Sequence, residues 1–252
     1  MNPHSATRLY VTCPLNENAV VGLESNQAHY LRAVLRLTTG AFVTLFNGVD
    51  GEWLAKIDGM GKSWSSLVMV NKLRDQIDTA DLWLLFAPIK KTRLSMIIEK
   101  AVELGVTKIL PTLTERTNVE RVRTPRLTAT AIEAAEQCER LDIPEIIEPA
   151  KLDKILESWD KTRILLVCAE FGEVTPITQT LKALENKGNV AFLIGPEGGF
   201  SKLELEKLSN HSFVIFVGLG PRILRAETAV ISALACWQSI RGDWTFRPPH
   251  RS

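Results

Sequence analysis

Short apolar runs alternate with longer amphipathic segments from residue 82 to residue 240, and this alternation limits the possible folds more than any other feature. The apolar runs span residues 82–87, 109–110, 164–168, 190–194 and 213–217. The segments with helical apolar spacing span residues 92–104, 126–140, 152–159, 176–186, 202–210 and 227–240. Fully apolar strands that alternate with helices are typical of a mainly parallel sheet covered on both faces. The sequence therefore predicts an α/β fold with a mainly parallel sheet for this part of the chain.

The residues before this region follow a different pattern. Short β-type runs span residues 8–12, 41–46, 53–57 and 67–70, and turn signals such as Asn47-Gly48 separate them. This pattern predicts a small β-barrel with one helical segment over residues 26–35, which would place Arg32 and Arg36 on one helical face. A polar stretch at residues 74–79 joins the two patterns. We therefore expect one domain over residues 1–74 and a second over residues 80–245.

Composition excludes several classes of protein. The chain has 252 residues, 45% of them hydrophobic, which is enough for two cores. No apolar run approaches the roughly 18 residues of a membrane helix, and no N-terminal segment is typical of a secretory signal, so we expect no membrane partner and a cytoplasmic location. The four cysteines and four histidines are scattered, which indicates neither a metal site nor a disulfide framework.

The charge is unevenly distributed along the chain although the formal net charge is only +1. Residues 88–126 carry nine basic against four acidic side chains, whereas acidic residues dominate residues 133–160. A nucleic-acid-binding protein needs a basic face and not a basic total. The basic stretch is compatible with RNA binding, but a solvated surface explains it equally well.

A first glycine-containing loop, Gly-Pro-Glu-Gly-Gly-Phe at residues 195–200, follows an apolar run and precedes a helical segment. Glycines let backbone amides approach a ligand closely, and the carboxyl end of a strand is where α/β sheets bind ligands. The loop lacks both G-x-x-x-x-G-K-[ST] and G-x-G-x-x-G, so a nucleotide phosphate is a poor candidate ligand.

A second loop, at residues 218–228, also joins an apolar run to an apolar helix, and it contains Arg222, Arg225 and Glu227. Two such strand ends could enclose one medium-sized ligand. The alternative interpretation is that both loops are tight turns between a strand and a helix and bind no ligand. The pairing of two such loops and their charged cluster favour a ligand site.

Taken together, the two loops resemble those of the SPOUT class of RNA methyltransferases, and the match is closer to the RsmE-type 16S ribosomal RNA (uracil-N3) methyltransferases within it. The resemblance rests on I-G-P-E-G-G-F and L-G-x-R-I-L-R-x-E-T-A in this order. It also includes residues 29–36, Gly40, residues 100–106 and residues 133–138 with Arg140 and Pro144.

The resemblance implies a PUA-like β-barrel that holds RNA, followed by a SPOUT α/β methyltransferase domain whose chain forms a trefoil knot. It implies a homodimer that acts on 16S ribosomal RNA, within the small subunit or a late assembly intermediate, with S-adenosylmethionine as the cofactor. The expected cofactor-binding residues are Leu193, Gly195, Gly198, Leu219, Leu224, Arg225 and Thr228.

Methylation of uracil N3 requires loss of the N3 proton, and the resulting negative charge is shared with the two ring carbonyl oxygens. A fixed cation beside these oxygens would stabilise the transition state. Arg225, at the mouth of the expected site, is the first candidate and Arg222 the second. Glu227 is a candidate proton acceptor, although an acidic residue at a helix start more commonly interacts with the helix dipole.

RNA capture is expected from basic side chains outside the cofactor loops. The candidates are Arg32, Arg36, Lys90, Lys91, Arg93 and Arg140. Glu133, Gln137 and Arg140 are spaced to share one face of the expected helix, either solvated or facing RNA or a second subunit. Another SPOUT reaction, on a ribose 2′-oxygen or guanine N1, and a non-catalytic RNA-binding role remain alternatives.

Overall fold

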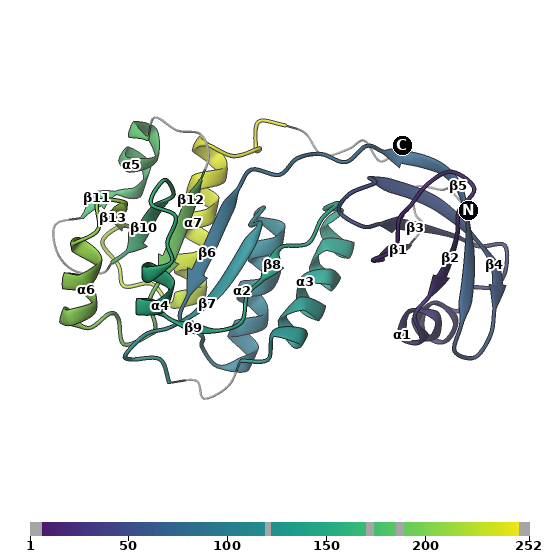
Figure 1. Cartoon of the computed structure of the whole chain (residues 1–252), viewed down its shortest axis with the longest axis horizontal. Coiled ribbons are helices and arrows are strands. Elements are labelled where there is room, and N and C mark those ends of the chain that lie inside the picture. The colour runs from purple at the N-terminus through teal and green to yellow at the C-terminus, as the bar shows by residue number, and fades with distance from the viewer. Residues whose placement is uncertain (1–6, 119–121, 170–173, 185–188, 247–252) are drawn as a thin grey trace. The chain divides into compact units, whose positions relative to one another are not determined.

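The computed structural model describes residues 7–118, 122–169, 174–184 and 189–246 (Figure 1). The chain forms two compact units. Of the described residues, the N-terminal unit contains those from Thr7 to Asp78 together with Ala135–Ile143, and the C-terminal unit contains Thr79–Ala134 and those from Pro144 to Phe246. The domain limits expected from the sequence stay a prediction. The sequence did not indicate that residues 135–143 would group with the N-terminal unit.

The N-terminal unit is built on a five-stranded sheet in the order β1-β3-β4-β5-β2. Its strands are β1 (Thr7–Tyr10), β2 (Val20–Leu23), β3 (Phe42–Phe46), β4 (Glu52–Met60) and β5 (Ser65–Arg74). The β1–β3 pair is parallel and the other pairs are antiparallel. Their inward side chains, among them Leu45, Ile57 and Leu67, form the core. The sequence predicted four of these strands and missed β2.

The helical segment predicted for residues 26–35 is present after β2, but its second half is not an α-helix. The α-helix α1 (Ser25–His29) continues into a π-helical turn, η2 (Tyr30–Val34), in which the Leu35 amide donates to the Tyr30 carbonyl. Arg36 lies beyond this turn with a left-handed backbone, φ 55°. The prediction that Arg32 and Arg36 share a helical face is therefore wrong.

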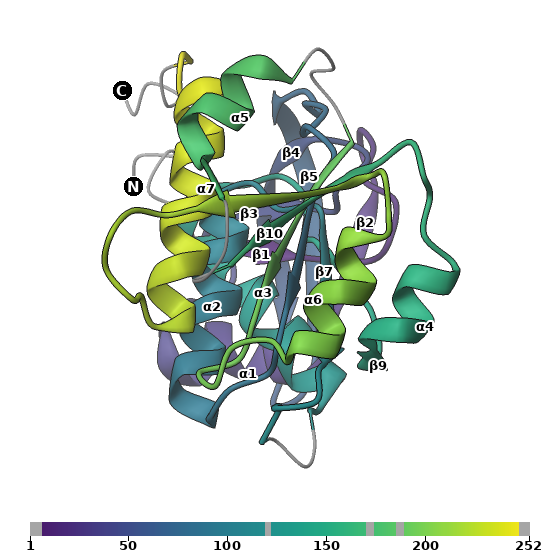
Figure 2. The ribbon, with the colours of Figure 1, turned by 90° about the vertical axis from the view of Figure 1, so that its left-hand side faces the viewer.

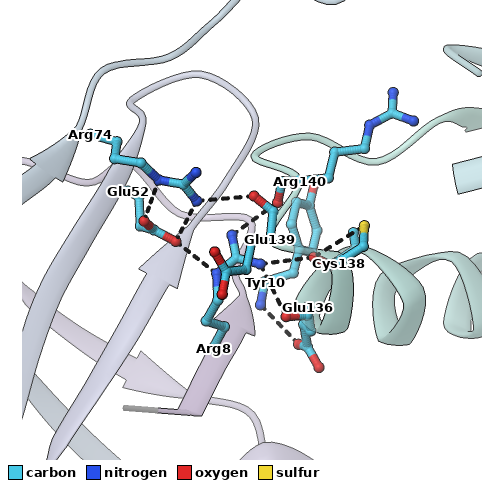
Figure 3. A network of polar contacts seen from close by, with 9 residues as sticks. Arg8, Tyr10, Glu52, Arg74, Glu136, Cys138, Glu139 and Arg140 are labelled. Atoms are coloured by element: carbon cyan, nitrogen blue, oxygen red, sulfur yellow. Dashed lines mark hydrogen bonds and ion pairs between the residues drawn. The ribbon is translucent and has the colours of Figure 1, made fainter. Parts of the chain in front are cut away.

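The end of helix α3 (Thr124–Cys138) also belongs to the N-terminal unit, and two arginines of the sheet bind carbonyls in its last turn and directly after it (Figure 3). Arg8 donates to the carbonyls of residues 135, 136 and 140, and Arg74 donates to that of Glu139, at 2.8–3.0 Å. The last turn of α3 carries no basic residue of its own. Cations from β1 and β5 thus satisfy carbonyls that a helix leaves unpaired at its C-terminus.

The C-terminal unit contains an extended sheet in the order β11-β13-β10-β12-β6-β7-β8, with β9 beside β7, and every pairing is parallel. The strands are β6 (Leu82–Phe86), β7 (Lys108–Leu113), β8 (Glu145–Ile146), β9 (Ala150–Lys151), β10 (Ile164–Cys168), β11 (Thr175–Pro176), β12 (Val190–Ile194) and β13 (Val214–Gly218). The predicted parallel sheet is confirmed. The two-residue strands β8, β9 and β11 were not predicted, because they are too short to show a pattern.

Helices cover both faces of this sheet (Figure 2). The helices α2 (Lys91–Glu103), α5 (Ile177–Ala183) and α7 (Ala226–Ile240) lie on one face, and α4 (Leu152–Glu157) and α6 (Lys202–Ser209) lie on the other. Strand residues such as Leu165, Val167 and Leu193 pack with α4 and α6 in a buried cluster. This two-sided burial explains why the central strands are apolar at every position.

Most helix limits agree with the sequence pattern within a few residues. One difference, at the end of α3, affects the helical face predicted for Glu133, Gln137 and Arg140. Helix α3 ends at Cys138, and Glu139 takes a left-handed backbone, φ 64°. Arg140 is therefore not on a helical face with Glu133 and Gln137, which corrects that prediction. Helix α5 ends at Ala183, and residues 185–186 of the predicted segment lie outside the described residues.

Candidate cofactor and RNA site

Three adjacent parallel strands, β12, β10 and β13, end side by side in the C-terminal unit. Cys168 at the end of β10 lies in register with Ile194 of β12 on one side and Val217 of β13 on the other. Both glycine loops leave the sheet at this edge and enclose a cavity of about 370 Å³. A cavity of this size at the carboxyl edge of a parallel sheet is typical of a site for a small organic ligand.

The first loop is held by its own aromatic residue and by a helix cap. A Cβ on Gly195 would come within 2.9 Å of the Phe200 ring, so the ring can pack there only against a glycine. Ser201 caps α6 and accepts from the Glu204 amide, while Glu204 accepts from the amides of Ser201 and Glu115. These bonds fasten the loop to α6 and to the segment that follows β7.

The second loop turns sharply before α7. Gly220 has φ 105°, a conformation that favours glycine, and open space surrounds the position of its absent side chain. The residues after it are exposed, with Ile223 at 76%. Arg225 occupies the N-cap position of α7. The loop therefore presents backbone groups and a run of exposed side chains at the mouth of the cavity.

The cavity brings together four of the seven predicted cofactor-binding residues, namely Gly195, Gly198, Leu219 and Leu224. The other three, Leu193, Arg225 and Thr228, are not among its described lining residues. Leu193 is fully buried in the cluster under α4 and α6, whereas Arg225 and Thr228 are exposed at the start of α7. Their contact with a cofactor stays a prediction.

Sequence reasoning missed several contributors to the cavity, among them Cys168, Val174 and Arg116. Cys168 and Val174 come from β10 and the chain after it, and Arg116 comes from the segment after β7. The apolar run at residues 164–168 is not followed by a glycine motif in the sequence, so nothing marked its end as part of the site. The Arg116 guanidinium donates to the Gly198 carbonyl at 2.6 Å and thus contacts the first loop directly.

An arginine of α2 links the two loops from another side. Arg93 donates to Glu197 of the first loop at 2.5 Å, and its Nε lies 3.6 Å from an Oε of Glu227 at the start of α7. The Glu227 side chain is only 11% exposed, and its second oxygen is buried without a hydrogen-bond partner among the described residues. Arg93, predicted as an RNA contact, is therefore engaged with two carboxylates, and Glu227 faces Arg93.

The cavity contains a thiol that stays protonated. Burial, with a smaller contribution from Cys236, raises the pKa of Cys168 to about 12. Because the thiolate is the reactive nucleophile, the Cys168 side chain is a neutral wall of the cavity near pH 7.

Within the described residues no group of His, Cys, Asp and Glu side chains is arranged to hold a metal ion.

The remaining predicted RNA contacts lie in both units. Arg32 and Arg36 are exposed, and Arg32 lines a shallow hollow with His29 and Lys62. Lys90 is exposed at the N-cap of α2, and the side chain of Lys91 is outside the described part of the structure. Arg140 makes a bidentate ion pair with Asp142, and its side chain is 9% exposed. Their roles in RNA binding stay predictions.

The fold and the cavity are those of a known class. Residues 77–238 match the RNA methyltransferase domain family, and residues 23–63 match the PUA domain of RNA methyltransferases.

No helix in the described part of the chain has the length and apolar character needed to cross a bilayer.

Curated relatives give the particular family. The chain is 38% identical to ribosomal RNA small subunit methyltransferase E of Rickettsia conorii, over 90% of this chain and 93% of that protein. It is 32% identical to the protein of the same name from Buchnera aphidicola subsp. Schizaphis graminum, over 94% and 97% of the two chains. The chain belongs to the ribosomal RNA small subunit methyltransferase E family, as the sequence motifs predicted.

Solved structures agree with this assignment. A Legionella pneumophila methyltransferase in complex with S-adenosylmethionine is 30% identical, has a TM-score of 0.83 and covers 94% of this chain and 99% of its own. A Neisseria gonorrhoeae ribosomal RNA small subunit methyltransferase E bound to S-adenosylmethionine is 26% identical, has a TM-score of 0.84 and covers 95% and 99%. The predicted fold class, a SPOUT-type α/β domain after a PUA-like domain, is confirmed.

Proposed function

We propose that this chain transfers a methyl group from S-adenosylmethionine to N3 of a specific uracil in 16S ribosomal RNA. The observation that carries the proposal is the cavity between the two glycine loops, in a chain whose relatives are named as small-subunit ribosomal RNA methyltransferases. Two structures that share its fold hold S-adenosylmethionine. The target base is proposed from the family resemblance.

The residues of the cavity fit this cofactor. Apolar side chains, including Ile194, Leu219 and Leu224, can flank an adenine ring, and the glycine-rich backbone offers hydrogen-bonding groups to its edge. The charged residues of the described lining, Arg116, Glu197 and Arg222, suit a zwitterionic amino-acid tail. When bound, S-adenosylmethionine supplies a methyl group activated by its sulfonium. The Cys168 thiol, which stays protonated, would leave the cavity wall without a thiolate nucleophile.

The chain itself has to align the base, exclude water and stabilise the charge left by the N3 proton. Arg225 is the proposed cation beside the uracil oxygens, because it is exposed at the N-cap of α7 next to the cavity. Arg222, which lines the cavity, is the second candidate. Glu227 is retained as a candidate proton acceptor, but its ion pair with Arg93 favours a role in fixing α7.

RNA binding is proposed for both units. Exposed Arg32, Arg36 and Lys90 are suited to phosphate contacts, which position a nucleic acid without reading its sequence. Lys91, Arg93 and Arg140 complete the proposed set. A splayed-out uracil would then enter the site from a single-stranded segment of the RNA.

The wider context is proposed from the family resemblance. We place the protein in the cytoplasm as a homodimer with a trefoil-knotted C-terminal domain and without a metal ion, acting on the small subunit or a late assembly intermediate. Size-exclusion chromatography with light scattering tests the dimer. A monomer at micromolar concentration would remove it from the proposal.

The primary test combines cofactor binding and RNA analysis. Calorimetric titration should show one S-adenosylmethionine site per chain, and its absence would favour a non-catalytic RNA-binding role. Nucleoside mapping of 16S ribosomal RNA from a strain lacking the protein should then show loss of 3-methyluridine. Loss of a ribose methylation or of 1-methylguanosine would replace the proposed acceptor with one of the alternatives.

A further inference from the structure

Arg116 is a cation of the cavity to which neither the glycine motifs nor the family resemblance assigned a role. It reaches the cavity from the segment between β7 and α3, far in sequence from both loops. The side chain is exposed, and its guanidinium donates to the Gly198 carbonyl at 2.6 Å. The position of an absent Cβ on Gly198 lies 3.5 Å from the Arg116 side chain, so the arginine stem runs along the glycine.

The segment that carries Arg116 is fastened on both sides of this residue. The Glu115 amide donates to Glu204 of α6 at 2.9 Å, and the Thr114 amide donates to the Thr117 hydroxyl at 2.9 Å. The bond to Gly198 uses one of the five N–H donors of the guanidinium. Arg116 is thus a positioned cation at the edge of the cavity, and its other donors have no partner within the described part of the chain.

The charges of the cavity indicate which part of the cofactor this cation would contact. Among the described residues, the charged ones that line the cavity are Arg116, Arg222 and Glu197, and Arg93 already compensates the Glu197 charge at 2.5 Å. The described part of the cavity edge therefore leaves two arginines for a ligand. S-adenosylmethionine carries one anionic group, the carboxylate of its methionine portion, and arginine binds carboxylates in a planar two-bond geometry.

We propose that Arg116 binds the methionine carboxylate of S-adenosylmethionine and is the residue by which the site recognises the amino-acid portion of its cofactor. This inference rests on the proposed use of S-adenosylmethionine. Arg222 is less suited to the role, because it lies in an exposed stretch beside Ile223, whereas Arg116 is fixed to the first loop.

The test compares two ligands that differ in the amino-acid portion. 5′-Methylthioadenosine contains the adenosine and the sulfur but no carboxylate. Calorimetric titration of Arg116→Gln should show S-adenosylmethionine affinity lowered by about tenfold, the usual effect of losing one partly exposed charge-assisted hydrogen bond. Affinity for 5′-methylthioadenosine should change by less than about twofold. Arg126→Gln, an exposed arginine on α3, is the matched control and should leave both affinities unchanged.

The possible outcomes separate this inference from the proposed function. If the unsubstituted protein binds neither ligand, the proposed function fails. If it binds S-adenosylmethionine and Arg116→Gln weakens both ligands equally, Arg116 only shapes the first loop and the inference is overturned. Unchanged S-adenosylmethionine affinity together with weaker RNA binding would overturn it in favour of an RNA contact. Arg116→Lys keeps the positive charge, and it should recover part of the lost affinity for S-adenosylmethionine alone.

Discussion

Two arginine clusters use the same residue types in opposite ways. In the N-terminal unit, Glu52 lies between Arg8 and Arg74 at 2.6–2.7 Å, and its side chain is only 8% exposed. In the C-terminal unit, Arg116 and Arg222 line an open cavity. In the first cluster the charged groups pair with one another, and the two arginines also bind carbonyls at the end of α3, so this cluster stabilises the fold. Within the described part of the chain, the second leaves guanidinium donors available for a ligand.

Removal of Glu52 should have the largest effect on stability. Breaking a buried ion pair leaves uncompensated charges, so Glu52→Ala should lower the free energy of unfolding by about 3–5 kcal/mol. Urea denaturation followed by circular dichroism measures this loss. The control is Asp58→Asn, an exposed carboxylate on the same strand, which should change it by less than about 0.5 kcal/mol. A loss below about 1 kcal/mol for Glu52→Ala would mean that the cluster is not a structural element.

Substitution at the cavity mouth should instead affect turnover. Arg225→Ala should lower kcat by about 10²–10³-fold, the size measured for a lost transition-state donor, with little change in cofactor affinity. Single-turnover methylation of 16S ribosomal RNA and calorimetry provide the two numbers. Equal losses in both would make Arg225 a cofactor-binding residue only. Arg126→Ala should behave like the unsubstituted protein.

Arg93 is intermediate between the buried Glu52 cluster and the exposed Arg225, because it is partly exposed, hydrogen-bonded to Glu197 and ion-paired with Glu227. Arg93→Gln leaves the buried Glu227 carboxylate without its ion-pair partner and should lower the free energy of unfolding by about 1–2 kcal/mol. Adding Glu227→Gln should recover part of this loss, and the double-mutant cycle measures the coupling. Strict additivity would show that the 3.6 Å contact contributes nothing to stability.

The pH dependence of stability should also distinguish the N-terminal cluster. Burial raises the pKa of Glu52, but hydrogen bonds and charges from Arg74 and Arg8 outweigh it and hold the pKa below its usual range. The stabilisation is therefore complete above the unfolded-state pKa of about 4.3 and is lost as the pH falls through the lower folded-state pKa. Denaturation from pH 6 to pH 3 should show a loss of stability, part of which Glu52→Gln removes. An unchanged slope in that variant would assign the loss to other carboxylates.

The sequence predicted the parts of the molecule that depend on repeated patterns. The apolar strands β10 and β12 were predicted to the residue, and the two glycine loops were placed at one sheet edge. Features fixed by single backbone conformations or by distant partners were missed. Arg36 and Glu139 end their helices with positive φ although neither is a glycine. Sequence spacing therefore placed Arg36 and Arg140 on helical faces that do not exist.

The same limit applies to the site. Arg116 reaches the cavity through a bond to Gly198, 82 positions away, and no local pattern encodes such a contact. The pairing of Arg93 with Glu197 and Glu227 likewise requires the tertiary structure. The sequence analysis also did not single out Glu52, whose two arginine partners come from different strands.

The smallest expected effect concerns Cys168, the uncharged counterpart of the arginines that line the cavity. Its pKa of about 12 means that at pH 9 roughly one thiol in a thousand is a thiolate, whereas an ordinary cysteine is largely ionised there. Iodoacetamide labelling followed by peptide mass spectrometry should therefore be slow at Cys168 at pH 9 and fast after unfolding in urea. Because the folded-state pKa is raised, the labelling rate should keep increasing above pH 9. Labelling as fast in the folded protein as in the unfolded chain would show that the cavity wall carries a reactive thiolate, and the contrast between a charged edge and a neutral interior would no longer hold.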